Sequence, residues 1–165
     1  MTGVPILSPT PRPVAAILWG GLLAGVGDIT QAFVVFGFYG ATPFGILQHI
    51  AGGILGPRTR QLGWTSAWLG LAIHFFIATT AAAVYYLASR RLRMLVARPV
   101  LSGLLFGEMV FLFMYFVVLP LSAWGPAKFN TGTYLTGPLG HTFLVGLPIA
   151  LVVRHFAPLP GKAPR

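Results

Sequence analysis

The chain has only two acidic residues, Asp28 and Glu108, and both lie inside long apolar segments. His74 and His141 lie inside two further apolar segments, so each of four segments carries one ionisable side chain near its middle or outer half. A charge at membrane depth is costly, so such residues are rare, face the protein interior and usually mark function. The pattern predicts a buried polar site built by four helices.

Carboxylates and histidines in series can bind a cation or pass protons, and ion or proton handling is therefore the preferred interpretation. Gln31 follows Asp28 by about one helical turn and joins the predicted site. The predicted ion- or proton-binding residues are Asp28, Gln31, His74, Glu108 and His141.

Three other interpretations of these residues stay open. Carboxylates and imidazoles suit a divalent metal such as Zn, Mn or Fe, here through His49, His74, His141, Asp28 and Glu108. His74 and His141 have compatible depths for the axial ligands of a b-type haem. The same groups can also pair with one another purely as packing contacts between helices. The chain contains no phosphate loop, dinucleotide fingerprint or plausible nucleophile setting, so the sequence gives little support for an enzyme.

The elements that must position these residues are four apolar segments, roughly 14–39, 63–89, 99–121 and 133–156. Each is long enough to cross a bilayer core, which needs about 20 apolar residues. Residues 42–56 are apolar but too short to span, and Pro43 and Pro57 bound them, which predicts a short interfacial or re-entrant helix. The expected fold is all-α, a polytopic membrane protein with four transmembrane helices plus this short helix, in a single domain over residues 1–165.

The composition supports lipid as the main solvent. The chain is 56% hydrophobic and 8% charged, whereas a soluble domain carries roughly 25% charged residues. No basic face with interleaved aromatic residues accompanies the net charge of +9, so we expect no nucleic-acid partner. The absence of cysteine excludes disulfides, thiolate metal ligands and cysteine catalysis.

Basic residues are distributed unevenly between the predicted ends of the spans, and cytoplasmic loops carry an excess of Lys and Arg. One set comprises the two termini and the 90–98 loop: Arg12, Arg90, Arg91, Arg93, Arg98, Arg154, Lys162 and Arg165, which makes eight. The other two loops hold Arg58, Arg60 and Lys128, which makes three. Both termini are therefore expected in the cytoplasm.

Small residues recur at helical spacing beside most of the ionisable groups. Asp28, His74 and His141 each share a face with glycines, and small residues let helix backbones approach closely in lipid, so these three side chains should face the bundle interior. Glu108 shares its face with larger residues, and its direction stays open. The predicted helix-packing glycines are Gly21, Gly25, Gly70, Gly103, Gly107 and Gly137.

Several short motifs carry a resemblance. Residues 103–107 read Gly-Leu-Leu-Phe-Gly, Pro120-Leu-Ser follows, and Gly140-His141 precedes an apolar run that ends in Arg154. His74 precedes the run 78–86. Over the last three segments the chain resembles the small bacterial inner-membrane proteins of the YagU type. The resemblance implies a polytopic fold in a bacterial inner membrane, and it supplies no activity.

Four short spans enclose little volume, so we expect a homo-oligomer or a place in a larger membrane complex, with the lipid bilayer as the main partner. The alternative to ion or proton handling is a non-catalytic structural subunit or assembly factor that uses the same polar residues to join helices.

Overall fold

The structure is a computed structural model that describes residues 11–126 and 131–157, with side chains for 11–126 and 136–157. The described part is helical, without strands. Four helical stretches are long and apolar enough to cross a membrane, which confirms the predicted count and places the spans close to the expected bounds. They are Pro13–Gly37, Trp64–Arg91, Pro99–Leu121 and Thr136–Phe156.

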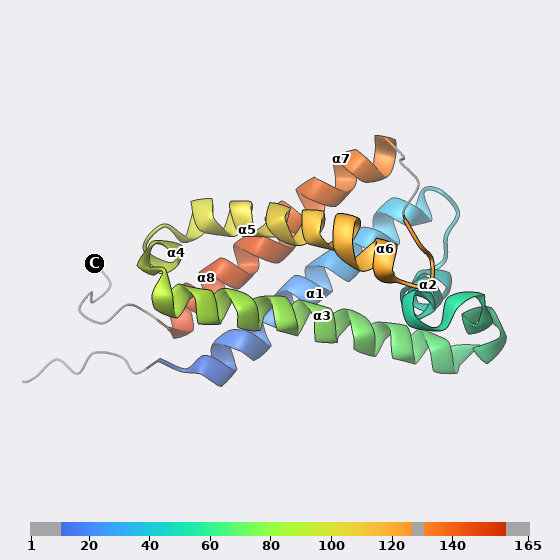
Figure 1. Ribbon diagram of the computed structural model, residues 1–165, viewed down its shortest axis with the longest axis horizontal. Helices are drawn as coiled ribbons and strands as arrows, with labels where there is room; N and C mark the ends of the chain where they lie inside the picture. The colour runs from blue at the N-terminus through green and yellow to red at the C-terminus, as the bar shows by residue number, and fades with distance from the viewer. Residues whose placement is uncertain (1–10, 127–130, 158–165) are drawn as a thin grey trace, which may run out of the picture.

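The first span is α1 (Pro13–Gly37) and the second is α3 (Trp64–Arg91). The third consists of α5 (Pro99–Phe113), the π-helical η2 (Met114–Val118) and α6 (Leu119–Leu121). The fourth consists of α7 (Thr131–Gly140), the π-helical η3 (His141–Gly146) and α8 (Leu147–Phe156). Successive spans run in opposite directions along the bundle (Figure 1).

The start of α1, the short α4 (Arg93–Ala97) and the end of α8 lie at one end of the bundle, with α2 and α6 at the other (Figure 1). The backbone N–H of Arg12 donates to the Phe156 carbonyl at 2.8 Å. Arg90 Nη1 donates to the Ala157 carbonyl at 3.1 Å. The start of the first span and the end of the fourth are therefore tied together.

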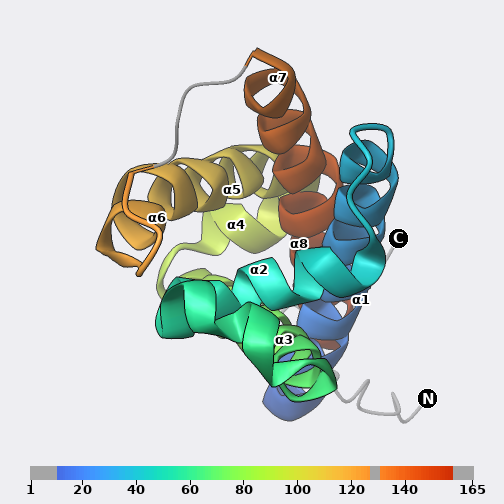
Figure 2. The same ribbon diagram turned by 90° about the vertical axis from the view of Figure 1, so that its right-hand side faces the viewer.

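The predicted short helix is α2 (Pro43–Leu55), followed by the 3₁₀ helix η1 (Gly56–Leu62). Pro43 occupies the first turn, where a missing N–H costs nothing, and Thr42 Oγ1 accepts from the Gly45 N–H at 3.1 Å. Gly56 ends the helix with a φ of +64°, which glycine adopts without a steric penalty. Figure 2 shows α2 lying across the end of the bundle rather than along it.

The core consists mainly of small residues. Alanines on α1, α3 and α8 pack with a few larger side chains, and the buried cluster is Ala16, Ala24, Ala82, Tyr85, Val145, Ile149, Ala150 and Val153. Many large apolar side chains, such as Leu18, Phe76 and Phe116, are exposed instead. Close helix approach through small residues, with large apolar residues outside, is the pattern that suits a lipid solvent.

The glycines of the predicted packing set lie at helix contacts. A Cβ at Gly21 or Gly25 would collide with Thr79 or Phe75 of α3, and one at Gly103 would come within 2.9 Å of Leu147 and Ala150. A Cβ at Gly70 would collide with the Leu47 carbonyl of α2, one at Gly107 with the His141 carbonyl, and one at Gly137 with the Phe111 ring.

Each π-helical segment lies just before a proline, η2 before Pro120 and η3 before Pro148. Proline lacks an N–H and its ring clashes with the carbonyl four residues back. A wider, π-helical turn relieves this clash. Leu147 N–H accordingly donates to the Thr142 carbonyl, five residues back. π-Helical bulges within α-helices are frequent at functional sites. His141 is the first residue of the π-helical η3.

Candidate functional site

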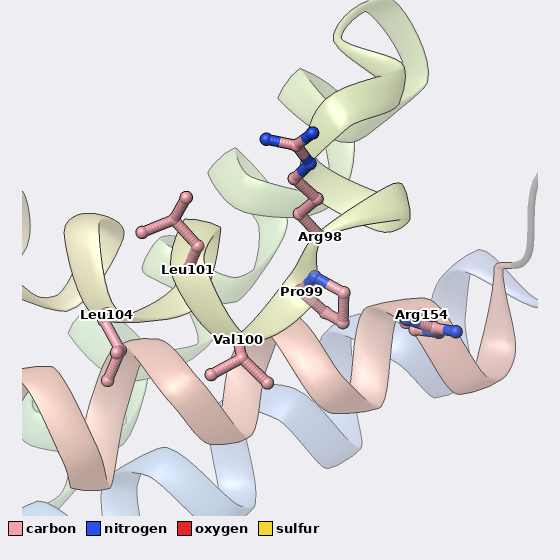
Figure 3. A pocket seen from close by; sticks show the side chains of 6 residues that line it. All are labelled: Arg98, Pro99, Val100, Leu101, Leu104 and Arg154. Atoms are coloured by element: carbon pink, nitrogen blue, oxygen red, sulfur yellow. The ribbon is translucent and has the colours of Figure 1, made fainter.

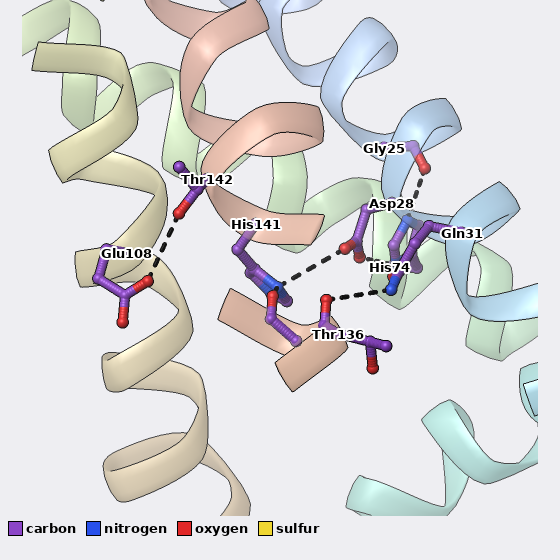
Figure 4. Close-up of polar contacts among 9 residues, drawn as sticks. Gly25, Asp28, Gln31, His74, Glu108, Thr136, His141 and Thr142 are labelled. Atoms are coloured by element: carbon purple, nitrogen blue, oxygen red, sulfur yellow. Dashed lines mark hydrogen bonds and ion pairs between the residues drawn. The ribbon is translucent and has the colours of Figure 1, made fainter. Parts of the chain in front are cut away.

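Asp28 lies between two histidines that come from different helices (Figure 4). Its Oδ2 is 4.0 Å from His74 Nδ1 of α3, and its Oδ1 is 3.8 Å from His141 Nδ1 of η3. We call Asp28, His74 and His141 the Asp28 cluster. Both distances exceed a hydrogen bond, so the contacts are electrostatic and each leaves room for a bridging water or a small closing movement.

The position of His74 depends on Gly25, one turn before Asp28 on α1. His74 Nε2 lies 2.9 Å from the Gly25 carbonyl oxygen. Gly25 has no side chain, and a Cβ there would come within 2.7 Å of the Phe75 ring. The glycine therefore lets α3 approach closely enough for its histidine to reach the backbone of α1.

His141 is held by its own helix and by α5. Its Nδ1 lies 3.0 Å from the Gly137 carbonyl, four residues back. Its ring meets the Phe111 ring edge-on, with centroids 5.5 Å apart. The same Nδ1 lies 3.8 Å from Asp28 Oδ1, beyond hydrogen-bond range, so a hydrogen on Nδ1 is donated to the Gly137 carbonyl while it faces Asp28.

The hydrogen bond to Gly25 fixes the tautomer of the other histidine, His74. A carbonyl oxygen only accepts, so His74 Nε2 must carry a hydrogen. A neutral His74 would then present a bare Nδ1 lone pair to a carboxylate oxygen of Asp28. One additional proton, either on Nδ1 or on the carboxyl group, removes this repulsion. The contact with Gly25 therefore sets the tautomer of His74, with a hydrogen on Nε2.

The side chains of the Asp28 cluster are less buried than the sequence predicted. The side chains of Asp28, His74 and His141 are 22%, 12% and 20% exposed, so none is enclosed by the described chain. The small residues bring the helix backbones so close together that the larger polar groups sit at the margin of the helix contacts, not in a central cavity.

Glu108 is not part of the cluster. Its Oε2 accepts a long hydrogen bond of 3.4 Å from Thr142 Oγ1, on the residue that follows His141. Asp28 lies about 22 Å along α1 from Pro13, and Glu108 about 14 Å along α5 from Pro99. Since both helices start at the same end, the second carboxylate is staggered toward that end.

Gln31 and His49, also predicted for the site, have other neighbours. Gln31 Nε2 donates to the Thr136 carbonyl at 3.2 Å, which ties α1 to α7 beside the cluster. His49 stacks on Trp124, with ring centroids 4.9 Å apart, at the α2 end of the bundle. Desolvation and, secondarily, the positive charge of Arg60 lower the pKa of His49 from its usual 6.5.

The metal and haem alternatives gain no support from the geometry. Within the part of the chain whose side chains are described, no three His, Cys, Asp or Glu residues form a group suited to a metal ion. The Nδ1 atoms of His74 and His141 face one carboxylate from two helices, so a porphyrin between them would have to displace Asp28.

Sequence reasoning missed three participants. The Gly25 and Gly137 carbonyls orient the two histidines, and Thr142 binds Glu108. Both glycines were predicted, but only as packing residues. Thr142 carries no sequence signal beyond its place next to His141.

The scan against protein-family models finds no match, and the searches of curated proteins and of solved structures return no similar chain either. The resemblance to the YagU type stays a prediction.

Proposed function

We propose that this chain is a membrane protein that handles protons, or a cation in their place, through the Asp28 cluster. The observation that carries the proposal is the position of the Asp28 carboxylate, within 4.0 Å of one imidazole nitrogen on each of two other helices. Histidine changes charge near neutral pH, and carboxylate–histidine chains at membrane depth are typical of proton relays.

The proposed chemistry is exchange of one proton. A proton between His74 Nδ1 and Asp28 Oδ2 neutralises the repulsion of the two acceptors, while the other carboxylate oxygen faces the N–H of His141. Asp28 is therefore the common partner of the two histidines: it can give its proton to His74 Nδ1, and a His141 that carries hydrogens on both ring nitrogens can replace that proton from Nδ1. Glu108, staggered toward the end that holds the start of α1 and the end of α8, supplies the second carboxylate of the path.

The proposed location is a bacterial inner membrane with both termini in the cytoplasm. The end of the bundle that holds the start of α1 and the end of α8 also holds Arg90, Arg91 and Arg98. The incomplete burial of the Asp28 cluster supports a homo-oligomer or a larger complex, since a protein neighbour would cover groups that are costly to expose to lipid.

The second candidate function is a structural subunit or assembly factor. It is favoured by one observation: the side-chain contacts of His74 and Glu108 and the amide of Gln31 all join different helices. In that case the Asp28 cluster contributes stability and no flux.

Proton flux into liposomes, followed with a pH-sensitive dye, tests the proposal. Wild-type protein should carry flux, and Asp28→Asn should fold with an unchanged thermal midpoint yet lose it, because the amide keeps the shape and removes the charge. His49→Gln, outside the cluster, is the matched control and should retain flux. Flux in Asp28→Asn equal to that of the wild type, or no wild-type flux under any cation or pH gradient, would contradict the proposal.

The structural and haem alternatives predict different measurable results for the same purified proteins. A structural role predicts that Asp28→Asn lowers thermal stability or loses co-purifying subunits. A haem role predicts a Soret band that disappears in His74→Ala and His141→Ala. We expect no Soret band.

A further inference from the structure

Gln31 lies about one turn beyond Asp28 on α1 and reaches the helical turn that leads into His141. Its Nε2 donates to the Thr136 carbonyl at 3.2 Å, and Figure 4 shows this bond beside the Asp28 cluster. Its amide also lies against the buried Gly140, where a Cβ would come within 3.0 Å of the amide carbon and oxygen. The amide of Gln31 therefore contacts α7 at both ends of the turn that precedes His141.

The same turn supplies the acceptor that orients the His141 ring. The residue after Thr136 is Gly137, and its carbonyl oxygen lies 3.0 Å from His141 Nδ1. A carbonyl oxygen only accepts, so this contact keeps a hydrogen on Nδ1. Bonds of this kind decide which ring nitrogen of a neutral histidine carries the hydrogen. A displacement of the turn would weaken the bond and remove the preference for Nδ1.

The turn is not fixed by its own helix alone. Pro138 lies inside α7, where it cannot donate a helical hydrogen bond. The π-helical η3 then begins at His141. The regular hydrogen-bond ladder is therefore interrupted within the turn and directly after it, so a side chain from another helix can set the position of the turn.

The start of α5 faces the other half of the fourth span across a shallow groove. The groove is lined by Arg98, Pro99, Val100, Leu101, Leu104 and Arg154. Its surface is apolar, and in Figure 3 Val100 and Leu104 point toward α8, whereas the Arg98 guanidinium points away from the groove and from Arg154. This half of the span is therefore positioned by apolar side chains, in contrast to the turn that Gln31 holds from α1.

We infer that Gln31 is the positioning residue of His141. It fixes the turn whose Gly137 carbonyl keeps the hydrogen of the neutral ring on Nδ1, the nitrogen that faces Asp28. Gln31 acts through His141 and exchanges no proton itself, since an amide does not titrate. The functional consequence rests on the proposed function, because the Nδ1 hydrogen is the one that His141 would give to Asp28. The tautomer itself does not depend on flux and can be measured separately.

¹⁵N NMR of histidine-labelled, full-length protein in detergent tests the inference, at a pH where the rings are neutral and with His141→Gln to identify the signals. Wild-type His141 should carry its hydrogen mainly on Nδ1. Gln31→Met keeps the length of the side chain without the donor. The ratio of Nδ1–H to Nε2–H forms should then fall by about threefold or more, the equivalent of part of one hydrogen bond.

Gln48→Met is the matched control. It removes another amide, one that is buried on α2 and lies 3.1 Å from each of its acceptors. This variant should lower stability and leave the His141 ratio unchanged. A general loosening of the bundle is thereby separated from a specific effect of Gln31.

Gly140→Ala reaches the same contact from the other side. The added Cβ should push the Gln31 amide off the Thr136 carbonyl, so the ratio should fall in the wild-type background but no further in Gln31→Met. A wild-type ring with its hydrogen mainly on Nε2, an unchanged ratio in Gln31→Met, an equal fall in Gln48→Met, or an added fall in the double variant would each overturn the inference. A tautomer that depends on Gln31 in a protein without flux would support the inference and contradict the proposed function.

Discussion

His74 Nε2 lies 2.9 Å from the carbonyl oxygen of Gly25, so a side chain of α3 is bonded to the backbone of α1 one turn before Asp28. This single contact fixes which nitrogen of His74 carries a hydrogen and leaves the other nitrogen facing the carboxylate. Helix packing and the tautomer of His74 are therefore set by the same close approach.

Replacement of Gly107 by alanine should separate α5 from η3. A Cβ at this position would collide with the His141 carbonyl and lie 2.7 Å from Thr142 Cα, both backbone atoms that cannot swing aside. Overpacking of this kind costs about 1–3 kcal/mol, so the thermal midpoint in detergent should fall. Gly37→Ala is the control because nothing lies within 4 Å of its Cβ position. Equal midpoints for the two variants would contradict the packing described.

Gln48 should be a stability determinant of the α2 end. Its Nε2 lies 3.1 Å from the carbonyls of Thr59 and Gly63 and from Ser66 Oγ, and the side chain is buried. Gln48→Leu removes these bonds and should cost about 1–3 kcal/mol of unfolding free energy. Chemical denaturation measures the loss. The exposed Gln61 provides the control Gln61→Leu, which should change little, and a similar loss in both would argue against the network.

The stacking of His49 on Trp124 predicts a pH dependence. Desolvation and Arg60 lower the pKa of His49 in the folded protein, so the folded state favours the neutral ring. Its contribution to stability is present above the unfolded value of about 6.5 and is lost as the pH falls through the folded value. NMR titration of the ring should give a midpoint below 6.5, and Arg60→Gln should raise it. A midpoint at or above 6.5 would contradict the assignment.

The proposed orientation rests on the uneven distribution of basic residues in the sequence, eight in the two termini and the 90–98 loop against three in the other two loops. Reporter fusions after Ala97 and after Arg165 should read cytoplasmic, and one near Gly56 should read external. A cytoplasmic signal at Gly56 would reverse the proposed orientation.

Hydropathy was sufficient to predict the four spans and the short α2, because lipid demands about 20 apolar residues from each spanning helix. Residue spacing also placed Asp28, His74 and His141 on faces rich in small residues, and the structure brings these three together. For Glu108 the larger neighbours left the direction open, and it lies beside Thr142 instead.

The details that set the chemistry could not be predicted. The bonds from His74 to Gly25 and from His141 to Gly137 end on backbone carbonyls, and every residue carries a carbonyl, so sequence gives no sign of which one is used. The π-helical η3 at His141 depends on how Pro148 is accommodated, which changes the direction of side chains by a fraction of a turn. Burial of the cluster was overestimated because a helical face shows a direction but not how much surrounds it.

The proposed proton exchange requires that the pair of His74 and Asp28 holds one exchangeable proton. ¹⁵N NMR of histidine-labelled protein near neutral pH, together with the infrared band of a protonated carboxyl group, measures it directly. We predict that His74 Nε2 is protonated and that one more proton is present, seen either as an Nδ1–H on His74 or as a carboxyl band that disappears in Asp28→Asn. A neutral His74 with a hydrogen on only one ring nitrogen, whichever it is, and no such band would contradict this proposal.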